Sequence, residues 1–101
     1  MERTYWIAYR IALNEHHLER LADFIDALYQ PTTATYWYET NNFKIFSSNL
    51  KISQIATKIK LAINTDKDTA VLGCTHHKSM RVIGKCDDQD LFSLVDFAAK
   101  H

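Results

Sequence analysis

Apolar and polar residues follow two different periodicities along this chain. Thr4 to Ile11 alternates with the period of two that is typical of a β-strand, whereas Asn14 to Tyr29 groups its apolar side chains on one helical stripe. Two more alternating stretches within Ala34 to Ser47 flank an Asn-rich turn, a second helical stretch covers about Asn49 to Ile63, and an apolar strand covers Thr69 to Cys74. The pattern predicts the order strand–helix–strand–strand–helix–strand.

This order predicts a single α+β domain over residues 1–101 with the ferredoxin-like, or split βαβ, arrangement: an antiparallel sheet with both helices on one face. The later pattern predicts a turn over Thr75 to Ser79 and a short fifth strand over Met80 to Ile83. A C-terminal helix is expected after Asp87 or Asp88, either of which can cap it. Its apolar stripe is Leu91, Leu94, Val95 and Ala98.

The first long helix has a start and a stop signal, and both long helices have a recognisable apolar stripe. Asn14 is the expected N-cap of the first helix, and Pro31 ends that helix because proline lacks a backbone donor. The stripe expected to face the sheet is Leu18, Leu21, Ala22, Ile25 and Leu28. The corresponding stripe of the second helix is Ile52, Ile55, Ala56, Ile59, Ala62 and Ile63.

Composition limits the class of partner and the compartment. The chain has 12 basic and 12 acidic residues, so its net charge provides no overall attraction to nucleic acid or to an anionic membrane. No apolar run approaches the ~18 residues of a membrane span, and the N-terminus lacks the layout of a signal peptide. Two cysteines, Cys74 and Cys86, do not form a disulfide framework. We therefore expect a cytoplasmic protein with free thiols.

The strands are rich in aromatic residues. Tyr5, Tyr9, Tyr36 and Tyr38 could lie side by side on a sheet face that the helices leave open. Aromatic side chains on such a face stack nucleobases in RNA-recognition modules. The alternatives are that the tyrosines pack in the core or cover the seam of a dimer.

Charges are distributed unevenly. Four lysines and no acidic residue lie between Thr40 and Thr65, whereas the first helix is mainly acidic. A basic helix face could track phosphates, and the asymmetry could steer two copies together; an ordinary solvated face is the remaining interpretation. The expected contact residues of the protein are Tyr5, Tyr9, Tyr36, Trp37, Lys44, Lys58 and Lys60.

The chain lacks the motifs of common catalytic and metal sites. Cys74, His76 and His77 are close in sequence, but they lack the paired spacing of zinc ligands. No serine lies in a G-x-S-x-G turn, and two glycines in total exclude a glycine-rich phosphate loop. The sequence therefore predicts no catalytic residue, no metal site and no cofactor.

The order and content of the strands also resemble a known family. The matching segments are Tyr5–Ile11, Tyr36–Glu39, Phe43–Ser47, Ala70–Leu72 and Met80–Ile83. Together they resemble the ferredoxin-like family that includes the second CRISPR adaptation nuclease and the virulence-associated protein D toxins. This resemblance implies a homodimer and a prokaryotic origin.

One position departs from the family. Its nucleases carry an aspartate at the end of the first strand, where it binds the catalytic metal across the dimer. Arg10 stands there in this chain, or Asn14 if the strand continues, and a cation does not ligate Mg²⁺. We therefore expect a non-catalytic binding or assembly module that forms a homodimer and contacts protein, with nucleic acid as the second candidate partner.

The alternative is a metal-dependent endoribonuclease of the toxin-like branch of that family. Glu39, Asp66 and Asp68 would supply its acids, because each lies near the end of a predicted strand. Two or more of these carboxylates would have to converge on one metal ion.

Overall fold

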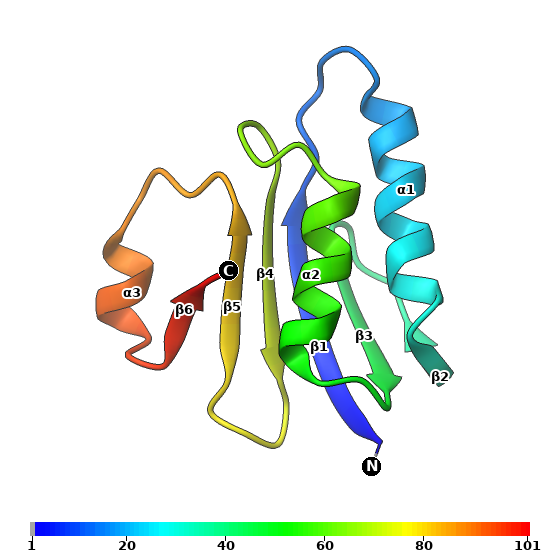
Figure 1. The fold of residues 1–101 in the computed structure, drawn as a ribbon, viewed down its shortest axis with the longest axis vertical. Helices are drawn as coiled ribbons and strands as arrows, with labels where there is room; N and C mark the ends of the chain where they lie inside the picture. Colours follow the sequence, from blue (N-terminus) through cyan, green and yellow to red (C-terminus); the bar gives the residue numbers. More distant parts are fainter. Residues whose placement is uncertain (1) are drawn as a thin grey trace.

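The computed structural model describes residues 2–101 apart from the side chains of residues 34 and 35. Its strands and helices follow one another along the chain as shown in Figure 1. They are β1 (Arg3–Arg10), α1 (His17–Tyr29), β2 (Thr32–Trp37), β3 (Phe43–Ser48), α2 (Ile52–Ala62), β4 (Thr69–Cys74), β5 (Met80–Gly84), α3 (Asp90–Leu94) and β6 (Ala98–Lys100). The predicted mixed α+β class is confirmed, and the strand Thr69–Cys74 has its predicted bounds.

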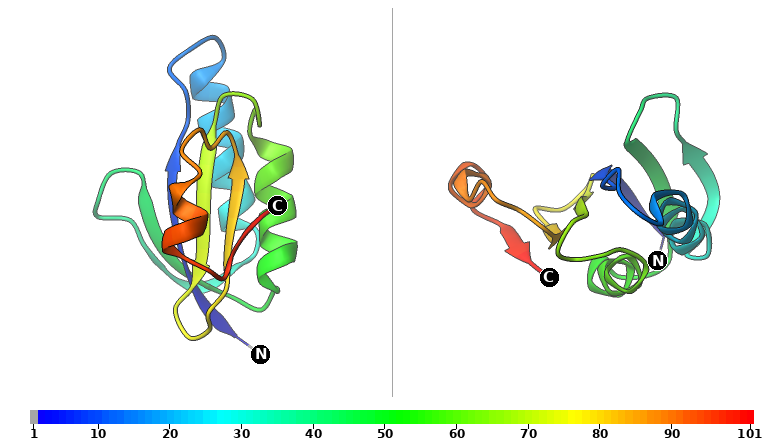
Figure 2. Two further views of the ribbon diagram at one scale, coloured as in Figure 1. Left: turned by 90° about the vertical axis from the view of Figure 1, so that its left-hand side faces the viewer. Right: turned by 90° about the horizontal axis from the view of Figure 1, so that it is seen from above.

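All six strands belong to one sheet with the order β2-β3-β1-β4-β5-β6. Every neighbouring pair is antiparallel except β5 and β6, which run parallel. Helices α1 and α2 cover one face of this sheet, whereas α3 and the β2–β3 loop lie on the other side (Figure 2). We call the side away from α1 and α2 the open face.

The core lies between the sheet and the two long helices. In β1, Tyr5 and Ile7 point toward the helices and are completely buried. Their partners across the sheet, Phe46 on β3 and Leu72 on β4, point the same way and are also buried. Directly opposed residues in a sheet share a face, so this register fixes which residues of each strand enter the core.

Helix α1 differs from the prediction at its start. It begins at His17, and the residue before it, His16, has a left-handed backbone with φ of 63°. Asn14 does not cap the helix. Its side-chain oxygen instead accepts a hydrogen bond of 2.6 Å from Arg20 Nη2. A tertiary partner for Asn14 has replaced the local capping bond.

The apolar stripe of α1 is also rotated relative to the prediction. Of the expected stripe, Leu28 is fully buried and Leu21 and Ile25 pack against the core, whereas Leu18 and Ala22 are exposed, Leu18 by 76%. Phe24, which was not on the expected stripe, is fully buried. The ring of Phe24 packs against the ring of Tyr9 with centroids 4.4 Å apart. The large Phe24 side chain thus decides which side of α1 faces the sheet, because it buries more area than the alanine.

Helix α2 packs as its pattern predicts. Ile55, Ala56 and Ile59 are completely buried, and Ile52 packs against the same core. The helix is shorter than expected because its first turn is closed at Lys51, whose backbone N–H donates 2.9 Å to Gln54 Oε1. No helix among residues 2–101 combines the length and the apolar content needed to cross a membrane.

The C-terminal segment is only partly the predicted helix. Helix α3 ends at Leu94, and Ala98, expected on its stripe, instead begins strand β6. The strand pairs with β5, and the His101 N–H donates 2.9 Å to the Val82 carbonyl. Pairing satisfies backbone groups along the outer edge of β5, which a continuous helix would leave unpaired.

The predicted hairpin is confirmed, with β2 displaced toward the N-terminus from the expected Ala34 to Glu39. Its turn contains Asn42 with φ of 58°, in agreement with the tolerance of asparagine for positive φ.

Candidate interaction surface

The open face carries a continuous apolar surface over the central strands. The register places Trp6 of β1 between Ile45 of β3 and Gly73 of β4, and Ala8 between Phe43 and Val71. Apart from the buried Gly73, these residues are half-buried. Because Tyr5 and Ile7 point toward the long helices, the residues that alternate with them point away, and the two helices leave this part of the sheet uncovered.

Three aromatic rings form a row across this surface. Phe43 stands in the middle, with its ring centroid 6.3 Å from Trp37 and 6.4 Å from Trp6. Trp37 meets it edge-on at 75°, and Trp6 is nearly parallel to it at 19°. A side chain on Gly73 would overlap the Trp6 indole, so glycine lets the indole lie close over β4. We call Trp37, Phe43 and Trp6 the aromatic row.

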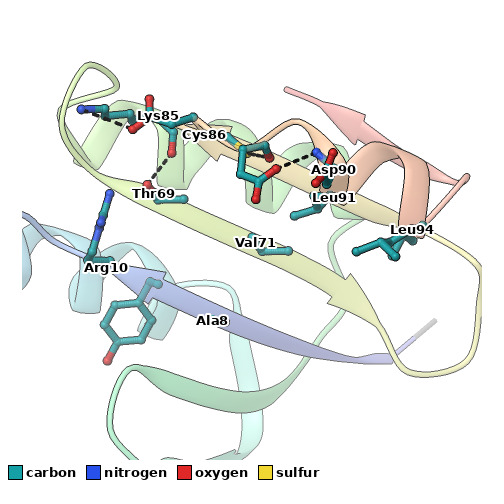
Figure 3. Close-up of a pocket in the computed structure, with 13 residues that line it drawn as sticks. Ala8, Arg10, Thr69, Val71, Lys85, Cys86, Asp90, Leu91 and Leu94 are labelled. Atoms are coloured by element: carbon teal, nitrogen blue, oxygen red, sulfur yellow. Dashed lines mark hydrogen bonds and ion pairs between the residues drawn. The ribbon is translucent and has the colours of Figure 1, made fainter.

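A groove of about 680 Å³ continues the open face toward α3. Its floor contains Ala8 of β1 and Val71 of β4, and Figure 3 shows Leu91 and Leu94 of α3 along its far side. Val82 has a register position on the open face but is fully buried. The α3–β6 segment therefore covers the outer part of this face and makes the wall of what we call the α3 groove.

Charged residues from both sides line one end of the α3 groove. Lys85 Nζ lies 3.7 Å from an Asp87 oxygen, and Asp88 Oδ1 accepts a hydrogen bond of 2.9 Å from the Asp90 N–H. Arg10, on the β1 side, has no carboxylate within 4.0 Å among the residues that the structure describes. Asp87 and Asp88 thus already have local partners, whereas Arg10 remains available to an acidic partner.

The tyrosines expected on the open face lie on the opposite side of the sheet. Tyr5 is completely buried and its hydroxyl donates 2.7 Å to the Leu50 carbonyl. Tyr9 and Tyr36 also pack against the core under the helices. Core packing, the alternative interpretation of these tyrosines, therefore holds for all three, and they form no surface open to solvent. Tryptophan alternates with tyrosine in β1 and β2, and it is the tryptophans, including the expected contact residue Trp37, that face outward.

Lys44 is another expected contact residue that is buried. It faces Ile7 in the register, on the helix side, and its Nζ lies 5.7 Å, 5.6 Å and 5.4 Å from the ring centroids of Tyr9, Tyr36 and Tyr38. Burial lowers the pKa of Lys44 below its ordinary value of 10.5. The three rings offset part of the desolvation cost of the cation, so Lys44 belongs to a structural cluster and offers little surface to a partner.

Replacing Tyr36 with phenylalanine is expected to stabilise the protein by about 1 kcal/mol, because the Tyr36 hydroxyl is buried without a hydrogen-bond partner. Burial, with the neighbouring Tyr29, raises the pKa of Tyr36 above its ordinary value of 10.0. Stability from the neutral phenol is therefore present below pH 10.0 and is lost as the pH rises above it.

Urea denaturation at neutral pH and above pH 10.0 measures both effects of this change. The phenylalanine variant should lose less stability in alkali than the parent protein. The matched Tyr38→Phe variant alters a ring that is 62% exposed and should leave the free energy of unfolding nearly unchanged. Destabilisation by Tyr36→Phe at neutral pH would show that its hydroxyl has a partner in solution.

The remaining expected contact residues, Lys58 and Lys60, lie on α2. Lys58 lines a shallow depression together with Asp23 and Asp26 of α1. Lys60 Nζ donates 3.3 Å to the His101 carbonyl. Helices α1 and α2 are neighbours, so the acids of α1 offset the charge of Lys58 locally, whereas Lys60 is bound to the C-terminal residue of the chain.

Asp68, a candidate acid of the endoribonuclease alternative, is fully buried in the fold. Its carboxylate is completely buried and accepts four hydrogen bonds: from the backbone N–H groups of Ala12 and Asn64 at 2.8 Å and 2.9 Å, and from Arg20 Nε and Nη2 at 2.9 Å and 3.2 Å. These donors occupy its oxygen lone pairs. No signal in the local pattern distinguishes Asp68 from the exposed Asp66.

The acids of the nuclease alternative do not form a recognisable metal centre. Within residues 2–101, no group of three or more histidine, cysteine, aspartate or glutamate side chains is placed to hold a metal ion. Glu39 is exposed in the β2–β3 loop and Asp66 is exposed in the turn before β4. Asp68, the third acid, is already saturated by hydrogen bonds.

Comparison of the chain with protein-family models, with curated proteins and with solved structures finds no match.

Proposed function

We propose that this protein is a non-catalytic assembly module in which two copies pair through their open faces. The observation that carries this proposal is the aromatic row, which lies beside half-buried aliphatic residues on a sheet face that the long helices leave uncovered. Contiguous apolar surface of this kind usually marks an interface, and homodimers with a twofold axis are the commonest soluble assemblies.

The proposal includes a ferredoxin-like unit built from β1 to β4 with α1 and α2. Two observations support it: the strand–helix–strand–strand–helix–strand order along the chain, and the spatial order β2-β3-β1-β4 with antiparallel pairing throughout. Strands β5 and β6 and helix α3 are then additions at one edge. We place the protein in the cytoplasm of a prokaryote, in keeping with its two free cysteines.

Protein contact is favoured over nucleic-acid contact. Binding to a nucleic acid requires several cations aligned along the backbone. The open face instead combines the basic Arg10 and Lys85 with three aspartates around the α3 groove. The endoribonuclease alternative has no observation in its favour, because the buried Asp68 is committed to Arg20 and to two backbone donors.

Light scattering over a range of micromolar concentrations tests the pairing. The parent protein is expected to show about twice the chain mass of 11.7 kDa. Trp37→Ser removes an aromatic anchor that is 38% exposed on the open face and should weaken dimerisation about tenfold or more. Leu61→Ser, a matched change of an exposed apolar residue on α2, should leave the dimer intact.

A parent protein that stays at 11.7 kDa at the highest concentration would contradict the assembly proposal. Equal weakening by Trp37→Ser and Leu61→Ser would place the interface elsewhere. Fluorescence anisotropy with labelled single-stranded RNA, recorded in parallel, is expected to show no binding to the parent protein. Specific RNA binding that Trp37→Ser abolishes would favour nucleic acid as the partner of the open face.

A further inference from the structure

Two features rise from the open side of the sheet and face each other across it. The β2–β3 loop, residues 38–42, projects from one side, and α3 stands at the other, at a similar height along the strands (Figure 2). The aromatic row and the α3 groove lie between them. The open side is therefore a trough with one projecting wall and one grooved wall.

The two walls are chemically complementary. The loop follows Trp37, and its residue Glu39 is exposed with no cation within 4.0 Å in the part of the chain that the structure describes. The groove offers Arg10 on its β1 side, a cation without a carboxylate partner there, together with Leu94, which is 83% exposed. The aspartates of the groove lie at the other side, between β5 and the start of α3, and Asp87 pairs with Lys85. An acid beside an aromatic residue on one wall thus matches a cation beside an aliphatic residue on the other.

A twofold axis makes both contacts at once. When two open faces meet around an axis that runs along the strands, the loop of each copy lies over the α3 side of the other. A twofold rotation about this axis preserves height along the strands, so the loop meets α3 of the other copy only if both lie at a similar height, as they do in Figure 2. Because such an interface is isologous, each contact occurs twice in the dimer.

We propose that the β2–β3 loop of each copy occupies the α3 groove of a second copy, with Glu39 against Arg10. This inference rests on the proposed dimerisation through the open face and specifies how the two faces are aligned. Trp37 then packs toward the aliphatic wall at Leu91 and Leu94, which is incompletely covered in the single chain. The charged pair fixes the alignment, and the apolar contact supplies most of the affinity.

A charge-exchange experiment tests this alignment. In a Glu39→Arg homodimer, arginine meets Arg10 twice, and in an Arg10→Glu homodimer, glutamate meets Glu39 twice. Each variant alone should dimerise about tenfold or more weakly than the parent protein, because like charges replace opposite charges at both contacts. The mixed pair contains one reversed and one native contact, both attractive, so an equimolar mixture should recover dimers of near-parental affinity.

Asp23→Arg and Lys67→Glu serve as matched controls, because they make the same charge changes at exposed residues outside the open face. Each control should leave dimerisation unchanged, alone or mixed. Circular dichroism of every variant verifies the fold, and analytical ultracentrifugation with one variant labelled separates mixed dimers from homodimers.

The outcomes separate this inference from the proposal beneath it. A parent protein that is monomeric at all concentrations overturns both. A dimer that Trp37→Ser weakens but that both charge variants leave intact retains the open-face interface and overturns the loop-in-groove alignment. Weakened variants whose mixture stays monomeric also overturn the alignment, because complementary charges then fail to restore it.

Discussion

Replacing Asp68 with asparagine is expected to lower the free energy of unfolding by about 3–5 kcal/mol, the range observed when one partner of a buried ion pair is removed. Asp68 is fully buried, and the Arg20 side chain is 14% exposed. The amide keeps one acceptor oxygen but turns the other position into a donor, which then faces the donors of Arg20 or of the backbone. Arg20 is left without its carboxylate.

The effect of this substitution depends on pH. Burial opposes ionisation of Asp68, but hydrogen bonds from Arg20 and from the backbone of Ala12 and Asn64 outweigh it and lower its pKa below the ordinary value of 3.8. Since the folded state has the lower pKa, this stabilisation is fully present above the unfolded pKa. It is lost as the pH falls through 3.8 toward the folded pKa. The stability that is lost on replacing Asp68 with asparagine should therefore be smaller in acid than at neutral pH.

Urea denaturation from neutral pH down to below pH 3.8 measures both effects. Asp66→Asn is the matched control, because Asp66 is exposed two residues away, and its change should stay within about 0.5 kcal/mol. If Asp68→Asn were as mild as this control, the hydrogen bonds of Asp68 would contribute little to the fold.

Gly84→Ala is expected to cost at least about 2 kcal/mol of stability for two separate reasons. Gly84 has φ of 83°, a region in which an L side chain is strained by about 1–2 kcal/mol. A Cβ at this position would also overlap the carbonyl oxygen of Asp68, which accepts a hydrogen bond of 2.8 Å from the Lys85 N–H. The backbone of β5 would have to move away from the segment that positions the Asp68 carboxylate.

A second substitution separates these two causes. Asparagine tolerates positive φ, so Gly84→Asn removes much of the backbone strain and keeps the overlap with the Asp68 carbonyl. Chemical denaturation should therefore show that Gly84→Asn remains clearly destabilised relative to the parent protein. Parental stability for Gly84→Asn would assign the whole cost to backbone strain and would contradict the close approach of Gly84 to Asp68.

The sequence determined the order of the elements because that order depends on local periodicity. The stripe of α2 agrees with the prediction because its apolar residues point in one consistent direction. Strand β4 agrees because its apolar run is bounded by polar residues on both sides. The hairpin turn followed from the tolerance of Asn42 for positive φ. The stripe of α1 was predicted less well, because spacing alone does not rank Phe24 against Leu18.

The tertiary structure decided which face of the sheet is covered, and with it the candidate surface. Strand β1 carries apolar residues on both faces, so its alternating pattern does not tell whether Tyr5 or Trp6 points into the core. The choice depends on which neighbours fit: Phe46 and Cys74 surround Tyr5 in the core, and Gly73 leaves room for the Trp6 indole outside it.

Long-range pairing also decided the roles of individual charges. Asp68 receives donors from Ala12 and Arg20, more than 40 residues away in sequence, and Lys44 is surrounded by tyrosines from two separate segments. Strand β6 exists because β5 offers an unpaired edge, although the local pattern of Ala98 suits a helix. Local periodicity predicts the order of the elements, whereas contacts between distant segments determine which side chains are buried and which stay exposed to a partner.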